Sequence, residues 1–305
     1  MQADTRRALG ALLIGLALAA GAAPALWPAG VRAAAAPTVR IGSKNFTEQV
    51  VLGELYAQAL EAKGTRVERK LNMGGTLIAH QALVNREIDM YPEYTGTALL
   101  NVLKAETMTD PEAVYQKVKR HYEEHFRLTW LERSPFNNGY VLVVKPETAR
   151  AHDLKTVSDL ARVGGKLRIG MGPEWRDRKD GLPGLKEVYG LEFAEAKAFA
   201  IALRYEALRT DNVEVVNGYA TDGQITANRL VRLKDDRGLW PPYHVAPVVD
   251  LKLVQEHPSV AQTLNAVTAL LTEERMSEMN LQVDGQKEEP KDVARDFLRR
   301  HGLVK

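Results

Sequence analysis

Short apolar runs alternate with segments of helical periodicity from residue 38 onward. The apolar runs predict strands over 38–43 (TVRIGS), 65–73 and 88–94 (IDMYPEY). The periodic segments predict helices over 45–64, 77–87, 97–104 and 111–125. We interpret Asn45 and Glu48 as a capping box at the start of the first helix. This order of elements favours a mostly parallel sheet with helices on both faces.

The same alternation restarts in the second half of the chain. It predicts strands over 139–147, 166–172 and 230–236, a strand plus a turn over 213–223, and helices over 156–164 and 197–210. A strand over 244–250 then returns to the first group, and three helical stretches finish the chain.

We therefore expect an α/β protein of two lobes, each a mostly parallel sheet flanked by helices, with the second lobe inserted in the first. Lobe 1 is expected to span 37–142 and 245–305, and lobe 2 to span 143–244. Ligands of open α/β sheets bind beyond the carboxyl ends of the strands, so those ends should meet at one cleft between the lobes.

Residues 1–36 differ in composition from the rest of the chain. Arg6 and Arg7 precede an apolar run (ALGALLIGLALAAGAAPAL) and then a segment of small residues (VRAAAAP). These regions are typical of an export signal, and we expect cleavage near residues 34–36. An uncleaved membrane anchor is the alternative, but the run over 8–23 is shorter than the about 20 residues that a spanning helix needs. We therefore expect a periplasmic protein with no direct membrane anchor.

The charges of the chain are nearly balanced. Lysine and arginine total 41, against 39 aspartates and glutamates. The excess lies in residues 1–36, which hold Arg6, Arg7 and Arg32 but only Asp4, so the exported chain should be electrically neutral. This balance gives no case for nucleic acid as a partner. The chain has no cysteine, which excludes a lipid-modified cysteine, thiolate metal sites and thiol catalysis.

Motifs of enzymes are incomplete in this sequence. The segment Gly170-Met171-Gly172 lacks the third glycine of a dinucleotide fingerprint, and Ser43-Lys44 lacks the S-x-x-K spacing of acylating enzymes. The seven histidines are scattered, with no pairing that suits a metal. We therefore expect a protein that is not an enzyme and that uses no cofactor or metal.

Four tyrosines lie in turns at the ends of predicted strands, in the segments PEYTGT, FNNGYVLVV, VNGYATDG and WPPYHVAP. A tyrosine at a strand end commonly packs against its own lobe. A common role is favoured when four such turns meet at one cleft, because a quaternary ammonium has no N–H to donate and is held by aromatic faces. The pattern therefore predicts an aromatic cage made of Tyr94, Tyr140, Tyr219 and Tyr243.

Cationic and hydroxyl side chains follow other predicted strands. Lys44 lies at the helix entry SKNFTE, Thr97 starts another helix, and Arg178 lies in EWRDRKDG after the strand over 166–172. Exposure to solvent is the usual fate of lysine and arginine. A carboxylate held by these three residues, with a trimethylammonium group in the tyrosine cage, describes a betaine.

Longer segments of the chain resemble a known family. The segments IGSKNFTEQVVLGELYAQALEAKG, NMGGTLIAHQALVNREIDMYPEYTGTAL and GPEWRDRKDGLPGLKEVYGLEF closely resemble the exported substrate-binding proteins of osmoprotectant ABC importers, and the resemblance covers nearly all of residues 38–303. It implies the two-lobed periplasmic binding-protein fold (type II), which closes around its ligand. It also implies delivery of that ligand to an ABC transporter permease with its ATPase.

The resemblance assigns the same residues to the site. The cage positions are Tyr94, Tyr140, Tyr219 and Tyr243, and the carboxylate positions are Lys44, Thr97 and Arg178. Gln49 corresponds to a position that contacts ligand in some members. Arg176 is an alternative to Arg178, and Tyr91 is an alternative to Tyr94. Glu93 either supports the cation or faces solvent.

Glycine betaine is the ligand that we expect, with choline, carnitine and ergothioneine as alternatives. The presence of both Lys44 and Arg178 suggests an anionic end on the ligand and argues against choline as the main substrate. A ligand sensor for a membrane receptor is the alternative function. We expect a monomer whose partners are a small-molecule betaine and the permease.

Overall fold

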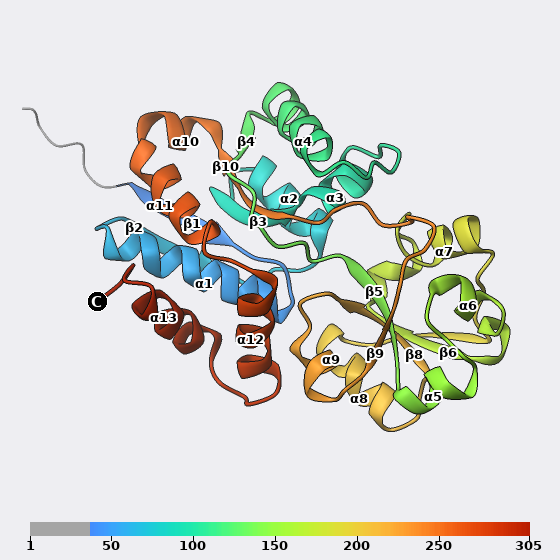
Figure 1. Ribbon diagram of the computed structural model, residues 1–305. Coiled ribbons are helices and arrows are strands. Elements are labelled where there is room, and N and C mark those ends of the chain that lie inside the picture. Colours follow the sequence, from blue (N-terminus) through green and yellow to red (C-terminus); the bar gives the residue numbers. More distant parts are fainter. Residues whose placement is uncertain (1–36) are drawn as a thin grey trace, which may run out of the picture. The chain divides into compact units, whose positions relative to one another are not determined.

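Residues 37–305 are described by the computed structural model, and they form two sheets flanked by helices (Figure 1). The export signal predicted over residues 1–36 lies outside the described residues. Within the described range, no helix combines the length and the apolar character needed to cross a bilayer.

The first sheet comprises β1 (Thr38–Gly42), β2 (Arg66–Lys70), β3 (Met90–Tyr94), β4 (Leu128–Trp130) and β10 (Val245–Asp250). Their order is β2-β1-β3-β10-β4. β1 is parallel to β2 and β3, whereas β10 is antiparallel to both of its neighbours. Four strands therefore point one way, and β10 alone opposes them within this sheet.

Helices cover both faces of the first sheet: α1 (Thr47–Ala62), α2 (Thr76–Val84), α3 (Thr95–Thr97), α4 (Pro111–Phe126), α10 (Leu251–Glu256), α11 (Pro258–Thr268), α12 (Glu273–Asp284) and α13 (Pro290–Arg300). α1 packs against α11, α12 and α13 on one face. α2 and α4 cover the other face, where Tyr91 and Val248 point, while the neighbouring Met90 and Val249 point toward α1. The inner strands β3 and β10 are thus buried on both sides, as their apolar residues predict, whereas the edge strand β2 is partly exposed.

The second sheet comprises β5 (Tyr140–Val144), β6 (Arg168–Met171), β7 (Glu195–Ala198), β8 (Val215–Tyr219) and β9 (Val231–Leu233). Their order is β7-β6-β8-β5-β9, and β5 is antiparallel to both of its neighbours. The flanking helices are α5 (Pro146–Ala151), α6 (Val157–Ala161), α7 (Leu182–Tyr189), α8 (Arg204–Arg209) and α9 (Gly223–Ala227).

The chain enters the second sheet at β5 and returns to the first at β10, and these are the two strands that oppose the direction of their sheets. The predicted fold class, two mostly parallel sheets with one lobe inserted in the other, is confirmed. The lobe boundaries stay a prediction, although β5 joins the second sheet as a whole strand from Tyr140 and so favours a first boundary before that residue.

Two local predictions are wrong. α1 begins at Thr47 after Phe46, with no side-chain cap, so Asn45 and Glu48 form no capping box. The helix predicted over 197–210 begins only with a 3₁₀ turn (Ile201–Leu203) that leads into α8, because residues 195–198 form β7 against β6. β7 lies at an edge of its sheet with half-exposed side chains, so its sequence (EAKA) lacks the apolar alternation of a buried strand.

Candidate functional site

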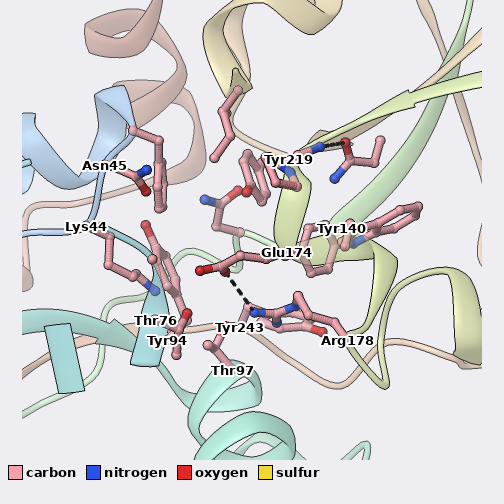
Figure 2. Close-up of a pocket in the computed structure, with 18 of the residues that line it drawn as sticks. Lys44, Asn45, Thr76, Tyr94, Thr97, Tyr140, Glu174, Arg178, Tyr219 and Tyr243 are labelled. Atoms are coloured by element: carbon pink, nitrogen blue, oxygen red, sulfur yellow. Dashed lines mark hydrogen bonds and ion pairs between the residues drawn. The ribbon is translucent and has the colours of Figure 1, made fainter. Parts of the chain in front are cut away.

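A cavity of about 230 Å³ lies between the residues of the two sheets (Figure 2). The first sheet contributes the end of β3 and the helix entries that follow β1 and β2, and the second contributes the start of β5 and the end of β8. All seven residues predicted for the cage and the carboxylate site line this cavity: Lys44, Tyr94, Thr97, Tyr140, Arg178, Tyr219 and Tyr243.

Sheet register brings two of the tyrosines together. β5 runs antiparallel to β8, and Tyr140 at the start of β5 pairs directly with Tyr219 at the end of β8. Their ring centroids are 5.3 Å apart. Tyr243, just before β10, approaches the Tyr140 ring edge-on, with centroids 5.5 Å apart at 80°. Burial raises the pKa of all four cage phenols, so they are neutral at pH 7 and offer uncharged faces.

Phe46 completes the row of rings and was missed by the sequence argument. It stacks 5.5 Å from Tyr219 and 6.3 Å from Tyr94, so it joins the aromatic residues of the two sheets. Trp175 also lines the cavity, 5.6 Å from Tyr140. A signal was available for both, because Phe46 lies two residues after Lys44 and Trp175 lies three residues before Arg178.

Lys44 is buried against a carboxylate. Its Nζ donates to Glu93 Oε1 at 2.6 Å and lies 4.7 Å from the centroid of the Tyr94 ring. Burial lowers the pKa of Lys44, and the neighbouring Glu93 opposes that effect. Glu93 is itself fully buried and also accepts from the Tyr91 hydroxyl at 3.1 Å. Of the two roles considered for Glu93, exposure to solvent is therefore wrong.

Arg178 is paired in the same way. Its Nε and Nη2 donate to the two oxygens of Asp180, at 2.8 and 2.7 Å. Asp180 is fully buried and also accepts from the Tyr243 hydroxyl at 2.5 Å. Each cation that faces the cavity thus has its own buried carboxylate, which the sequence did not reveal. Lys44 keeps two further N–H donors, and the Nη1 group of Arg178 is not used by Asp180.

The other predicted residues lie off the cavity wall. Gln49 is buried, and its Oε1 accepts from the backbone N–H of Lys44. Tyr91 belongs to the core between β3 and α4. Arg176 is exposed and donates to the carbonyl of Ala196. The geometry therefore favours Arg178 over Arg176 and Tyr94 over Tyr91 at the cavity.

Glu48 links the two sheets behind the cage. Its carboxylate accepts from the hydroxyl of Tyr94 at 2.6 Å, from Asn138 at 2.8 Å and from Asn280 at 3.0 Å. It also accepts from the hydroxyl of Thr221, which follows β8. Burial raises the pKa of Glu48 and outweighs these hydrogen bonds, which act to lower it.

Metal ligands do not gather in this part of the molecule. Within residues 37–305, no cluster of histidine, aspartate or glutamate has the arrangement of a metal site. The cavity wall offers aromatic faces on one side and buried N–H donors on the other.

Comparison with known proteins agrees with this geometry. The family described as the substrate-binding domain of the ABC-type glycine betaine transport system matches residues 37–300. A carnitine transport binding protein of Listeria monocytogenes is 34% identical over 267 residues, which cover 87% of each chain. A glycine-betaine-binding protein of Pseudomonas aeruginosa is 36% identical, over 89% of this chain and 90% of that protein.

A solved structure, that of a glycine betaine/carnitine/choline ABC transporter, matches with a TM-score of 0.73 at 32% identity. The match covers 88% of this chain and 100% of that one. Sequence, fold and cavity lead to the same conclusion: the chain belongs to the family of substrate-binding domains of ABC-type glycine betaine transport systems.

Proposed function

We propose that this chain captures a betaine-type quaternary ammonium compound between its two lobes and delivers it to an ABC importer. The observation that carries the proposal is the meeting of a row of neutral aromatic rings with two buried cations in one cavity. The rings attract the diffuse charge of a trimethylammonium group. Lys44, Thr97 and Arg178 offer donors to a carboxylate at the other end of the ligand.

Glycine betaine is the ligand that we expect to bind best. It carries both groups within the span of a small cavity, and relatives of this chain include binding proteins for glycine betaine and for carnitine. Carnitine and ergothioneine share the same two charged groups and are alternatives.

Choline is an alternative that one feature of the cavity favours. The sequence argument against choline counted Lys44 and Arg178 as free cations, but each is paired with a buried carboxylate. A ligand with no carboxylate would therefore not leave two uncompensated positive charges in the closed site. Selectivity between betaines and choline must come from finer features of the cavity wall.

The setting that we propose follows the family. The chain is exported by a signal over residues 1–36, acts in the periplasm as a monomer without a membrane anchor of its own, and meets a permease with its ATPase. It acts by binding and delivery, with no catalytic step. Two lobes close on the ligand in this proposal. Lobe 1 comprises residues 37–142 and 245–305, and lobe 2 comprises residues 143–244.

Calorimetric titration of the purified chain, residues 37–305, tests the proposal. The ligands to be compared are glycine betaine, proline betaine, carnitine, choline and ergothioneine. We expect glycine betaine to have the lowest dissociation constant of the five. Trp175 lines the cavity, so its fluorescence should change on binding. Absence of heat and of a fluorescence change with every member of the panel would contradict the proposed function.

A further inference from the structure

Glu174 is the one carboxylate on the cavity wall among the described residues 37–305. It belongs to a short 3₁₀ turn (Pro173–Arg176) that follows β6, and Figure 2 shows its side chain reaching into the cavity between Lys44 and Arg178. Its Oε2 lies 3.9 Å from Nη1 of Arg178. This is the guanidinium nitrogen that does not donate to Asp180. Glu174 thus stands where a ligand carboxylate would approach Arg178.

The same side chain reaches across to the first lobe. A Cβ placed on Gly75, the residue before α2, would lie only 1.3 Å from Oε1 of Glu174. The carboxylate therefore fills the space that a side chain at position 75 would occupy. A negative charge next to the start of a helix is also favoured by the helix dipole.

Glu174 decides the charge balance of the cavity. Lys44 with Glu93 and Arg178 with Asp180 form two buried pairs of opposite charge, so each pair is neutral. Glu174 adds one negative charge that has no cation of its own, and its side chain is 52% exposed, so it can swing toward solvent. The negative charge of Glu174 consequently attracts a cationic group and opposes the carboxylate of a zwitterion.

We propose that Glu174 is a specificity-determining residue that competes with the carboxylate of a zwitterionic ligand for Arg178 and Lys44 and that favours cationic ligands such as choline. This inference rests on the proposed function of the same cavity. A betaine must displace the Glu174 carboxylate to reach Arg178. Choline leaves this carboxylate in place, and its ammonium group is attracted by the negative charge.

The test compares glycine betaine and choline by calorimetry in the wild-type chain and in Glu174→Gln, which keeps the size of the side chain and removes its charge. We expect glycine betaine to bind more tightly and choline more weakly, so that the ratio of the choline Kd to the glycine betaine Kd rises by about tenfold. Glu187→Gln is the matched control, because it removes the same charge from an exposed position on α7 away from the cavity, and it should leave the ratio unchanged.

Gly75→Ala gives an independent test with the charge of Glu174 kept. The added methyl group displaces the Glu174 carboxylate, so the ratio should change, and the change should vanish when Glu174→Gln is already present. The inference is overturned if Glu174→Gln changes both dissociation constants by the same factor or changes neither. If the wild-type chain binds neither ligand, the proposed function fails and the inference fails with it. If the wild type binds both ligands and Glu174→Gln leaves the ratio unchanged, only the inference fails.

Discussion

The ring of Tyr219 contacts residues from both lobes. The guanidinium carbon of Arg204 lies 4.5 Å from its centroid, and Phe46 stacks at 5.5 Å. We expect Tyr219→Ala to weaken glycine betaine and choline alike by about thirtyfold, because a desolvated cation–π contact contributes about 2 kcal/mol. Tyr219→Phe keeps the aromatic face and should bind both ligands nearly as well as the wild type. Calorimetry checks this, and equal losses in the two variants would contradict the cation–π role.

Arg178 has a second role, in stability, that follows from its buried partner. Removing it in Arg178→Ala leaves the fully buried Asp180 without its cation. We expect the free energy of unfolding to fall by about 3–5 kcal/mol, in addition to weaker betaine binding. Arg176→Ala removes the same charge from an exposed position and should change stability by less than about 0.5 kcal/mol.

Urea denaturation of both variants measures this difference. A variant Arg178→Ala as stable as Arg176→Ala would show that the Arg178–Asp180 pair does not hold the fold. The double change Arg178→Met with Asp180→Asn removes both charges together and should recover most of the stability without restoring betaine binding.

For single residues, the sequence predicted many of the side chains on the cavity wall but not the carboxylates that pair with its cations. Four of the seven predicted positions that line the cavity are tyrosines, which stand out because glycine, proline or asparagine marks the turns around them, and strand order places those turns at one edge. The carboxylate partner of Lys44 is set by tertiary packing, because Glu93 is 49 residues away along the chain, whereas Asp180 is two residues from Arg178. No local pattern could therefore predict the partner of Lys44.

α3 is fixed to the segment that leads into β10. The N–H of Thr95 donates to the carbonyl of His244 at 3.0 Å, and its hydroxyl donates to the carbonyl of Pro242 at 2.9 Å. Gly96 permits this approach, since a Cβ there would lie 2.8 Å from the Pro242 carbonyl oxygen and 2.9 Å from the ring of Tyr243. The contact therefore sets how Thr97 and Tyr243 face each other across the cavity.

Gly96→Ala should push these two segments apart. We expect a loss of about 1–3 kcal/mol in the free energy of unfolding, from overpacking, together with weaker ligand binding because Tyr243 is displaced. Gly165→Ala is the control, because a Cβ at Gly165 meets no atom within 4 Å. Denaturation and calorimetry measure both effects, and wild-type binding by Gly96→Ala would show that the contact does not position the cage.

Element prediction succeeded for the long helices and for most strands, and it failed for one exposed edge strand and one very short strand. The buried strands of both sheets and the long helices α1 and α4 follow their apolar patterns. The exposed edge strand β7 shows no apolar alternation, and the buried strand β4 has only three residues, too few to show a period. The capping box failed because α1 begins at Thr47 after Phe46, so Asn45 is not its N-cap, and because the Glu48 carboxylate accepts from Thr221 instead.

The linkage through Glu48 makes the stability of the whole molecule depend on pH. Burial raises the pKa of Glu48 in the folded protein above its value in the unfolded chain, about 4.3. The folded state then binds the proton of Glu48 more tightly than the unfolded state does. The contribution of this proton to the free energy of unfolding is fully present below the unfolded pKa and is lost as pH rises through the folded pKa. We expect the wild type to lose stability relative to Glu48→Gln as pH rises from about 4 into the neutral range.

Denaturant midpoints of both proteins over this range measure the effect. Other groups with raised pKa values, such as Asp284, titrate in both proteins, so the difference between the two curves isolates Glu48. A difference that is independent of pH, or that grows in favour of the wild type as pH rises, would contradict the raised pKa.

The architecture of the molecule followed from the order of its elements, because a restarted β-α alternation and a returning strand permit few topologies. The pairing that brings Tyr140 beside Tyr219 did not follow, since the antiparallel direction of β5 is decided by where the chain crosses between the sheets.

That pairing has a kinetic consequence. Tyr140 and Tyr219 are held together by hydrogen-bonded register within one sheet, so half of the cage exists before any ligand arrives, whereas Phe46 and Tyr94 belong to the other lobe. Association should therefore occur in two stages, a bimolecular encounter with the paired tyrosines and a unimolecular closing of the lobes. The observed rate in stopped-flow fluorescence should level off at high ligand concentration, and Phe46→Ala should speed dissociation while leaving the encounter rate nearly unchanged.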